Sequence, residues 1–117
     1  EDAFEALARM GNIGHHFDMV IIDPPAFAKN HTQVVQAVSA YERLTRLSLA
    51  VLRRGGALVQ ASCSSRVDAE TFFETVHRAA VQTGRPLREI ERTGHGLDHP
   101  ITFKEGGYLK CLFAVAP

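Results

Sequence analysis

Residues 17–25 read FDMVIIDPP, and this stretch decides the fold that the sequence predicts. Its first six residues are apolar apart from Asp18, which is typical of a central parallel strand covered on both faces. The two prolines that follow have no backbone N–H donors and therefore end the strand. Each proline also favours extended geometry in the residue before it, so we expect Asp23 to be held at the exit of the strand.

Amphipathic patterns on both sides of this strand predict helices. A short helix is expected over residues 2–10, with Asp2 as its N-cap. A longer helix is expected over residues 32–53, where apolar residues recur every three or four positions. Gly55 would close this helix, because glycine is common just beyond a helix C-terminus.

The second half of the chain repeats the alternation of helix and strand. A helix begins near Asp68, and we interpret Phe72 and Phe73 in its apolar stripe as core residues rather than a platform for stacking bases. Further strands are expected over residues 57–61, 87–92 and 108–115. Strands that alternate with crossover helices indicate an α/β fold with a mainly parallel sheet.

The composition predicts one ordinary domain, or part of one, over residues 1–117. Thirteen Lys and Arg residues balance thirteen Asp and Glu residues, so binding to a polyanion would need a local basic surface. No apolar run approaches the roughly 20 residues that span a bilayer, and the acidic start is unlike a secretory signal. We therefore expect a cytoplasmic protein. The lack of an initiator Met suggests a piece of a longer protein.

Two candidate chemical groups follow the first two strands. Asp23 leaves the first strand and Cys63 leaves the second, and ligands of parallel α/β sheets bind beyond the carboxyl ends of the strands. If these strands are neighbours, a carboxyl group and a thiol share one rim. Such a pair suits addition of a thiolate to an electron-poor ring, with the carboxyl group handling the proton.

The remaining cysteine and the histidines have simpler interpretations. Cys111 lies within an apolar strand and is expected to pack there, and a lone Cys63 could do the same. Both cysteines should be free thiols, because two cysteines cannot staple a small scaffold. The six histidines have no convincing metal-ligand spacing, so we predict no structural metal.

Five motifs in order resemble one enzyme family. They are FDMVIIDPPAFAK, a helix that carries a tyrosine, GGALVQASCSS, DHP and EGGYLK. Together they resemble the C-terminal part of the class I S-adenosylmethionine-dependent 23S ribosomal RNA cytosine-5 methyltransferases. The resemblance implies a partial Rossmann-like fold, with about the last four strands of a seven-stranded sheet and an antiparallel last strand. The glycine-rich loop that holds the cofactor in this family is not in the sequence.

The resemblance also implies roles for individual residues. Cys63 matches the nucleophile that attacks C6 of the cytosine, and Asp23 matches the acidic residue that holds the N3 edge of the base. Asp2, Asp23, Pro24 and Pro25 would contact S-adenosylmethionine. Phe27, Lys29, Asp98 and His99 would lie toward the ribosomal RNA substrate. The target base would have to be unpaired or flipped out of its helix.

Two other functions remain open. A methyltransferase that acts on an exocyclic amino group of adenine or guanine uses a similar acidic or amide residue followed by prolines and an aromatic residue, although here Ala26 separates Pro25 from Phe27. The chain could also be an inert half-domain that serves as an interaction module. Because the chain would lack the central first strand of the family's sheet, the strand over residues 17–22 would have an unpaired edge, so we expect a homodimer or a swapped oligomer.

Overall fold

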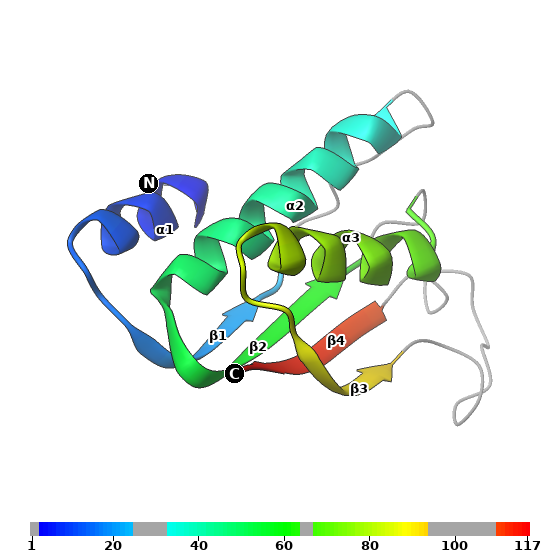
Figure 1. Cartoon of the computed structure of the whole chain (residues 1–117). Coiled ribbons are helices and arrows are strands. Elements are labelled where there is room, and N and C mark those ends of the chain that lie inside the picture. Colours follow the sequence, from blue (N-terminus) through cyan, green and yellow to red (C-terminus); the bar gives the residue numbers. More distant parts are fainter. Residues whose placement is uncertain (1–2, 25–32, 64–66, 94–109) are drawn as a thin grey trace.

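The computed structural model describes residues 3–24, 33–63, 67–93 and 110–117 of the chain (Figure 1). The elements along the chain are α1 (Ala3–Asn12), β1 (Phe17–Ile22), α2 (Val34–Val51), β2 (Leu52–Ser62), α3 (Ala69–Gln82), β3 (Arg88–Thr93) and β4 (Lys110–Ala116). In the described part of the chain, no helix is long and apolar enough to cross a membrane.

The strands form one mixed sheet in the order β1-β2-β4-β3. β1 pairs with β2 in parallel, and β4 is antiparallel to both β2 and β3. β3 therefore runs in the same direction as β1 and β2, and only the last strand is reversed. The expected α/β fold with an antiparallel last strand is confirmed.

All three helices lie on the same face of the sheet (Figure 1). α2 packs against both α1 and α3, and the core lies between this helical layer and the strands. Tyr41 and Phe72 are fully buried there, with their rings edge to face at a centroid distance of 5.1 Å. Phe73 is only 5% exposed, so the interpretation of this aromatic pair as core is confirmed.

The expectation that β1 is a central strand covered on both faces is wrong for this structure. β1 is an outer strand, and no described helix covers the second face of the sheet. Val20 and Ile22 are buried beneath the helices, whereas Met19 and Ile21 are 55% and 64% exposed. An apolar run reports the hydrophobicity of both faces of a strand, but it does not report which elements cover them.

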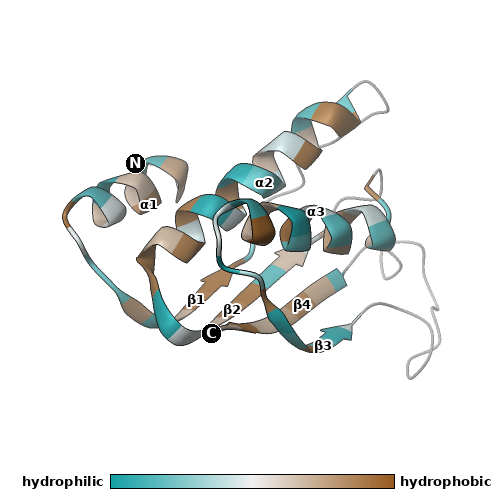
Figure 2. Ribbon diagram, viewed as in Figure 1, coloured by the Kyte–Doolittle hydropathy of each residue, from teal (hydrophilic) through white to brown (hydrophobic). Residues whose placement is uncertain are grey.

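The second face, here called the open face, is mostly apolar. β1, β4 and the second half of β2 are largely hydrophobic, whereas much of β3 is hydrophilic (Figure 2). The pairing register places Val59 beside Ile21 and Phe113 beside Val59. The open face therefore includes Met19, Ile21, Val59, Cys111 and Phe113.

The junction between α2 and β2 also differs from the expectation. α2 ends at Val51 and β2 begins at the next residue, so Gly55 lies within the strand instead of closing the helix. Gly55 has a φ of 80°, which suits glycine at the irregularity in the pairing of β1 with β2. At Gly56, an added Cβ would lie 2.9 Å from the carbonyl oxygen of Asp18, so this position allows close approach of the two strands.

Candidate functional site

The carboxyl ends of β1 and β2 meet at one rim of the sheet. Ile22 pairs with Gln60, so the residues that leave the two parallel strands emerge side by side. The Cys63 Sγ lies 3.9 Å from the Pro24 carbonyl oxygen, to which the thiol can donate a weak hydrogen bond. Cys63 and Asp23 are both exposed. The rim therefore presents an accessible thiol beside the segment that carries the carboxylate.

A buried polar network supports the rim from below. The Tyr41 hydroxyl on α2 is hydrogen-bonded to the Ser62 hydroxyl at 2.6 Å. Ser62 is the residue directly before Cys63. Thr45, one turn further along α2, donates to the Gln60 side-chain oxygen at 3.0 Å and to the Tyr41 carbonyl oxygen at 2.8 Å. The pKa of Tyr41 is raised, mainly because burial disfavours the phenolate, and the negative charge of a Cys63 thiolate adds to the rise.

A buried lysine lies behind the same strand ends. Lys110 pairs with Ser62 across β2 and β4 and is 5% exposed. Burial lowers the pKa of Lys110, and the negative charges of Asp68 and Cys63 oppose that shift. Asp68 caps α3 by accepting a hydrogen bond from the Thr71 backbone N–H at 2.7 Å, and this bond lowers the pKa of its carboxyl group. The predicted start of this helix near Asp68 is confirmed.

Cys111 lies near the rim on the open face. It is partly buried and pairs with Ala61. Burial raises the pKa of the Cys111 thiol, and the negative charge of Asp23 raises it further. A raised pKa favours the neutral thiol, which agrees with the packing role expected for Cys111. Both cysteines are free thiols, as expected.

The predicted site residues divide into those that the structure describes and those that it does not. Asp2, Pro25, Phe27, Lys29, Asp98 and His99 lie outside the described residues. Of the predicted site residues, the structure therefore positions Asp23, Pro24 and Cys63. Among the residues that the structure describes, no group of three or more His, Cys, Asp or Glu side chains could hold a metal ion.

Sequence reasoning assigned no role at the rim to Tyr41, Ser62 or Lys110. A signal for Lys110 was present, because a lysine that opens an otherwise apolar strand must place its ammonium group somewhere polar. Tyr41 gave no such signal, because an aromatic residue in the apolar stripe of a helix is also a normal core residue.

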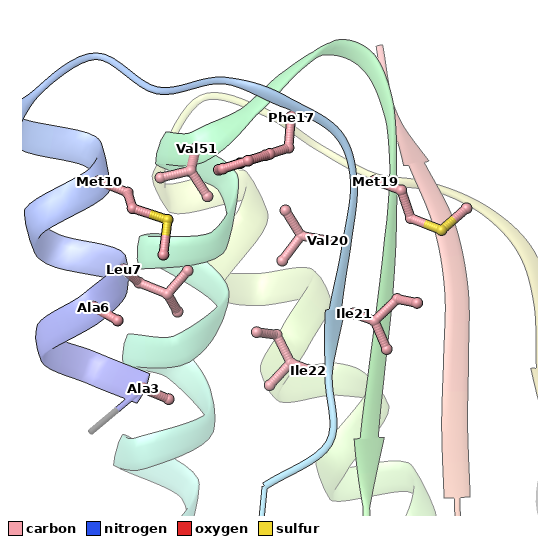
Figure 3. A pocket seen from close by; sticks show the side chains of 10 residues that line it. All are labelled: Ala3, Ala6, Leu7, Met10, Phe17, Met19, Val20, Ile21, Ile22 and Val51. Carbon is pink, nitrogen blue, oxygen red and sulfur yellow. The ribbon is translucent and has the colours of Figure 1, made fainter. Parts of the chain in front are cut away.

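A separate apolar pocket lies between α1 and β1. Its volume is about 300 Å³, and it is lined by Ala3, Ala6, Leu7, Met10, Phe17, Met19, Val20, Ile21, Ile22 and Val51. Figure 3 shows Val20 and Ile22 directed toward the helices and Met19 and Ile21 directed away from α1. Its lining includes neither Asp23 nor Cys63, so this pocket belongs to the outer strand of the sheet rather than to the rim.

Comparison with known proteins gives consistent results for sequence and for fold. No family model matches the chain. It is 40% identical over 112 residues to a ribosomal RNA large subunit methyltransferase of Deinococcus radiodurans, and this match covers 96% of the chain and 28% of the relative. It is 38% identical over 115 residues to the ribosomal RNA large subunit methyltransferase I of Shewanella amazonensis, covering 97% of the chain and 29% of the relative.

The fold comparison extends over nearly the whole chain. The structure superposes on SMU.776, a methyltransferase complexed with SAH, with a TM-score of 0.75 and 20% identity. This match covers 98% of the chain and 30% of that protein. The chain therefore has the Rossmann-like α/β fold of part of a class I methyltransferase domain, and it spans less than a third of the length of the ribosomal RNA large subunit methyltransferases that are its relatives.

Proposed function

We propose that residues 1–117 are the C-terminal portion of the catalytic domain of a cytoplasmic methyltransferase. This enzyme would use S-adenosylmethionine to methylate C5 of a cytosine in ribosomal RNA. The names of the relatives support methyl transfer to ribosomal RNA, and the fold supports the cofactor class. The observation that carries the proposal is the exposed Cys63 thiol, 3.9 Å from the Pro24 carbonyl oxygen at the carboxyl ends of two parallel strands.

In this proposal Cys63 is the nucleophile. Its thiolate forms a bond to C6 of the cytosine while Asp23 holds the N3 edge of the ring and supplies a proton there. The addition makes C5 electron-rich enough to attack a methyl group. S-adenosylmethionine, when bound, supplies that methyl group. Return of the N3 proton to Asp23, loss of the C5 proton to a base and expulsion of the Cys63 thiolate then restore the aromatic ring.

The arrangement at the rim fits a bound cofactor and a flipped base. Asp23 is exposed and Pro24 is partly exposed, so polar groups of this segment can reach a ligand. This is the edge of an α/β sheet where ligands bind. We assign Asp2, Asp23, Pro24 and Pro25 to cofactor binding, and Phe27, Lys29, Asp98 and His99 to RNA binding.

Substitution of the two cysteines in the complete protein tests this assignment. Cys63→Ala should abolish methyl transfer to ribosomal RNA, because the nucleophile is lost, while isothermal titration shows unchanged binding of S-adenosylhomocysteine. The matched control Cys111→Ala should retain most of the activity, because that thiol packs in the sheet. Full turnover by Cys63→Ala would instead indicate methylation of an amino group. Absence of cofactor binding by the unsubstituted protein would indicate an interaction module.

We also propose that the isolated chain self-associates with a second copy of itself. Support comes from β1, an outer strand whose Met19 and Ile21 side chains are mostly exposed. An apolar outer strand can pair with a strand of another chain or exchange elements with it. Light scattering after size-exclusion chromatography should give the mass of a dimer or larger species, and a monomer at micromolar concentration would refute the proposal.

A further inference from the structure

The polar network between α2 and β2 is unusual in its degree of burial. Tyr41, Thr45, Gln60 and Ser62 are all fully buried. Two contacts between side chains cross from the helix to the strand, namely Tyr41 with Ser62 at 2.6 Å and Thr45 with Gln60 at 3.0 Å. The Gln60 amide also donates to the Tyr41 carbonyl oxygen at 3.4 Å. Four polar side chains therefore occupy positions where apolar side chains would ordinarily pack.

Stability alone gives little reason to keep these hydroxyl and amide groups. Exchanging a satisfied buried polar pair for apolar side chains of similar shape is often neutral or even stabilising. Directional hydrogen bonds instead restrict how the helix lies along the strand, because a shift of the helix would break each bond. The network therefore fixes the alignment of α2 with the last residues of β2.

The contact between Tyr41 and Ser62 is the one next to the rim. Ser62 is the last residue of β2, and Cys63 follows it directly. The Tyr41 ring is held edge to face against Phe72, which fixes where the hydroxyl lies. The bond therefore restrains the backbone just before Cys63, and with it the position from which the thiol meets the Pro24 carbonyl oxygen.

We propose that Tyr41 is a positioning residue that acts through Ser62 to hold the Cys63 thiol at the geometry required for attack on the base. This inference rests on the proposed role of Cys63 as the nucleophile. It adds a requirement that the role alone does not make, namely a buried hydroxyl on α2 that is bonded to Ser62. Small displacements of a reacting atom are costly, about a hundredfold in rate for about 1 Å.

The test is Tyr41→Phe in the complete protein, which removes one buried hydroxyl and keeps the ring against Phe72. We expect kcat for methyl transfer to fall about tenfold, because the thiol is less often in the reactive geometry. KM for RNA and for S-adenosylmethionine should stay within about twofold, because binding groups are untouched. Ser62→Ala should give the same loss, and the double variant should be no slower than either single variant.

Thr45→Val is the matched control. It removes a hydroxyl from the same network, one helical turn further from Cys63, and keeps the shape of the side chain. Urea denaturation gives the unfolding midpoints of Tyr41→Phe and Thr45→Val, so that any loss of stability in the two variants can be compared. A kcat that falls equally in Thr45→Val and Tyr41→Phe would overturn the inference, because loss of stability would then account for both. An unchanged kcat in Tyr41→Phe would also overturn it.

These outcomes separate the inference from the proposed function. If Cys63→Ala retains turnover, the proposed chemistry fails whatever Tyr41→Phe does. If Cys63→Ala is inactive and Tyr41→Phe is fully active, only the positioning role fails. Losses in Tyr41→Phe and Ser62→Ala that multiply in the double variant would show that Tyr41 does not act through Ser62, and this result would also overturn the inference.

Discussion

Glu89 on β3 shows how neighbouring groups set the properties of one side chain. Its carboxylate accepts hydrogen bonds from the Arg92 guanidinium at 2.9 and 2.8 Å and contacts the His77 ring nitrogen at 2.9 Å. These contacts lower the pKa of Glu89 to about 2, with the Arg92 bonds as the main cause. The charged form of Glu89 is therefore favoured in the folded state relative to the unfolded state.

The lowered pKa of Glu89 predicts a loss of stability in acid. Its stabilising contribution is complete above the unfolded pKa of about 4.5 and is lost as the pH falls toward about 2. We expect Glu89→Gln to lower the free energy of unfolding by about 1 kcal/mol at pH 7, since the partners are partly exposed, and to reduce the fall below pH 5. Urea unfolding at several pH values measures this, with the exposed Glu91→Gln as control. Equal pH dependence in both variants would contradict it.

At the scale of elements, α2 is followed by β2 without a loop, and the carbonyl groups at the end of the helix need hydrogen-bond donors from elsewhere. Arg85, just beyond α3, supplies them. One of its terminal nitrogens donates to the carbonyl oxygens of Leu49 and Leu52, each at 2.5 Å. The other donates to the carbonyl oxygens of Arg53 at 3.0 Å and Ala116 at 3.3 Å. One guanidinium thus ties the end of a helix to the beginning of one strand and the end of another.

Arg85→Met should destabilise the fold by about 2 kcal/mol, because carbonyl groups lose a charged donor and some become unsatisfied. Arg85→Lys should recover only part of this loss, since an ammonium group lacks the planar arrangement of donors. The midpoint and slope of urea denaturation report the change. Arg88→Met, on the exposed part of β3, is the control and should cost little. A comparable loss in the two methionine variants would argue against this role.

At the scale of the whole molecule, the sheet is covered unequally. Three helices cover one face, whereas the open face carries exposed Met19 and Ile21 at its outer strand (Figure 3). Contiguous exposed apolar surface is usually a contact surface. This asymmetry is the physical basis of the proposed self-association. Contact with a second copy would bury the apolar side chains of the open face and pair the edge of β1.

Ile21→Lys should therefore shift the isolated chain toward monomer. A lysine on an outer strand is a common natural device against pairing of strand edges, and Ile21 is 64% exposed, so the fold should tolerate it. The control is Val35→Lys on α2, where the side chain is 78% exposed and lies away from the open face. Sedimentation velocity over a range of concentrations distinguishes the two. The same mass distribution for both variants would count against association through β1.

The sequence by itself determined the kinds of elements, their order and the fold class. The apolar run before Asp23, the helical spacing before Arg53 and the cap at Asp68 are local patterns, and the structure contains the strand and helices they predict. The same rules placed Asp23 and Cys63 at the carboxyl ends of two strands, and the pairing in the structure makes these strands parallel neighbours. Local spacing carries this information because secondary structure depends mainly on near neighbours in the chain.

Only the tertiary structure decided which faces are covered and which distant side chains meet. The contact of Tyr41 with Ser62 and the burial of Lys110 beside the rim join residues far apart in the chain, and no spacing rule relates them. The open face likewise exists because α1, α2 and α3 all lie on one side of the sheet. The apolar sequence of a strand does not predict on which side the helices pack. The burial of a residue depends on the other elements packed against it. For that reason the tertiary structure, and not the sequence, placed Tyr41, Ser62 and Lys110 beneath the rim.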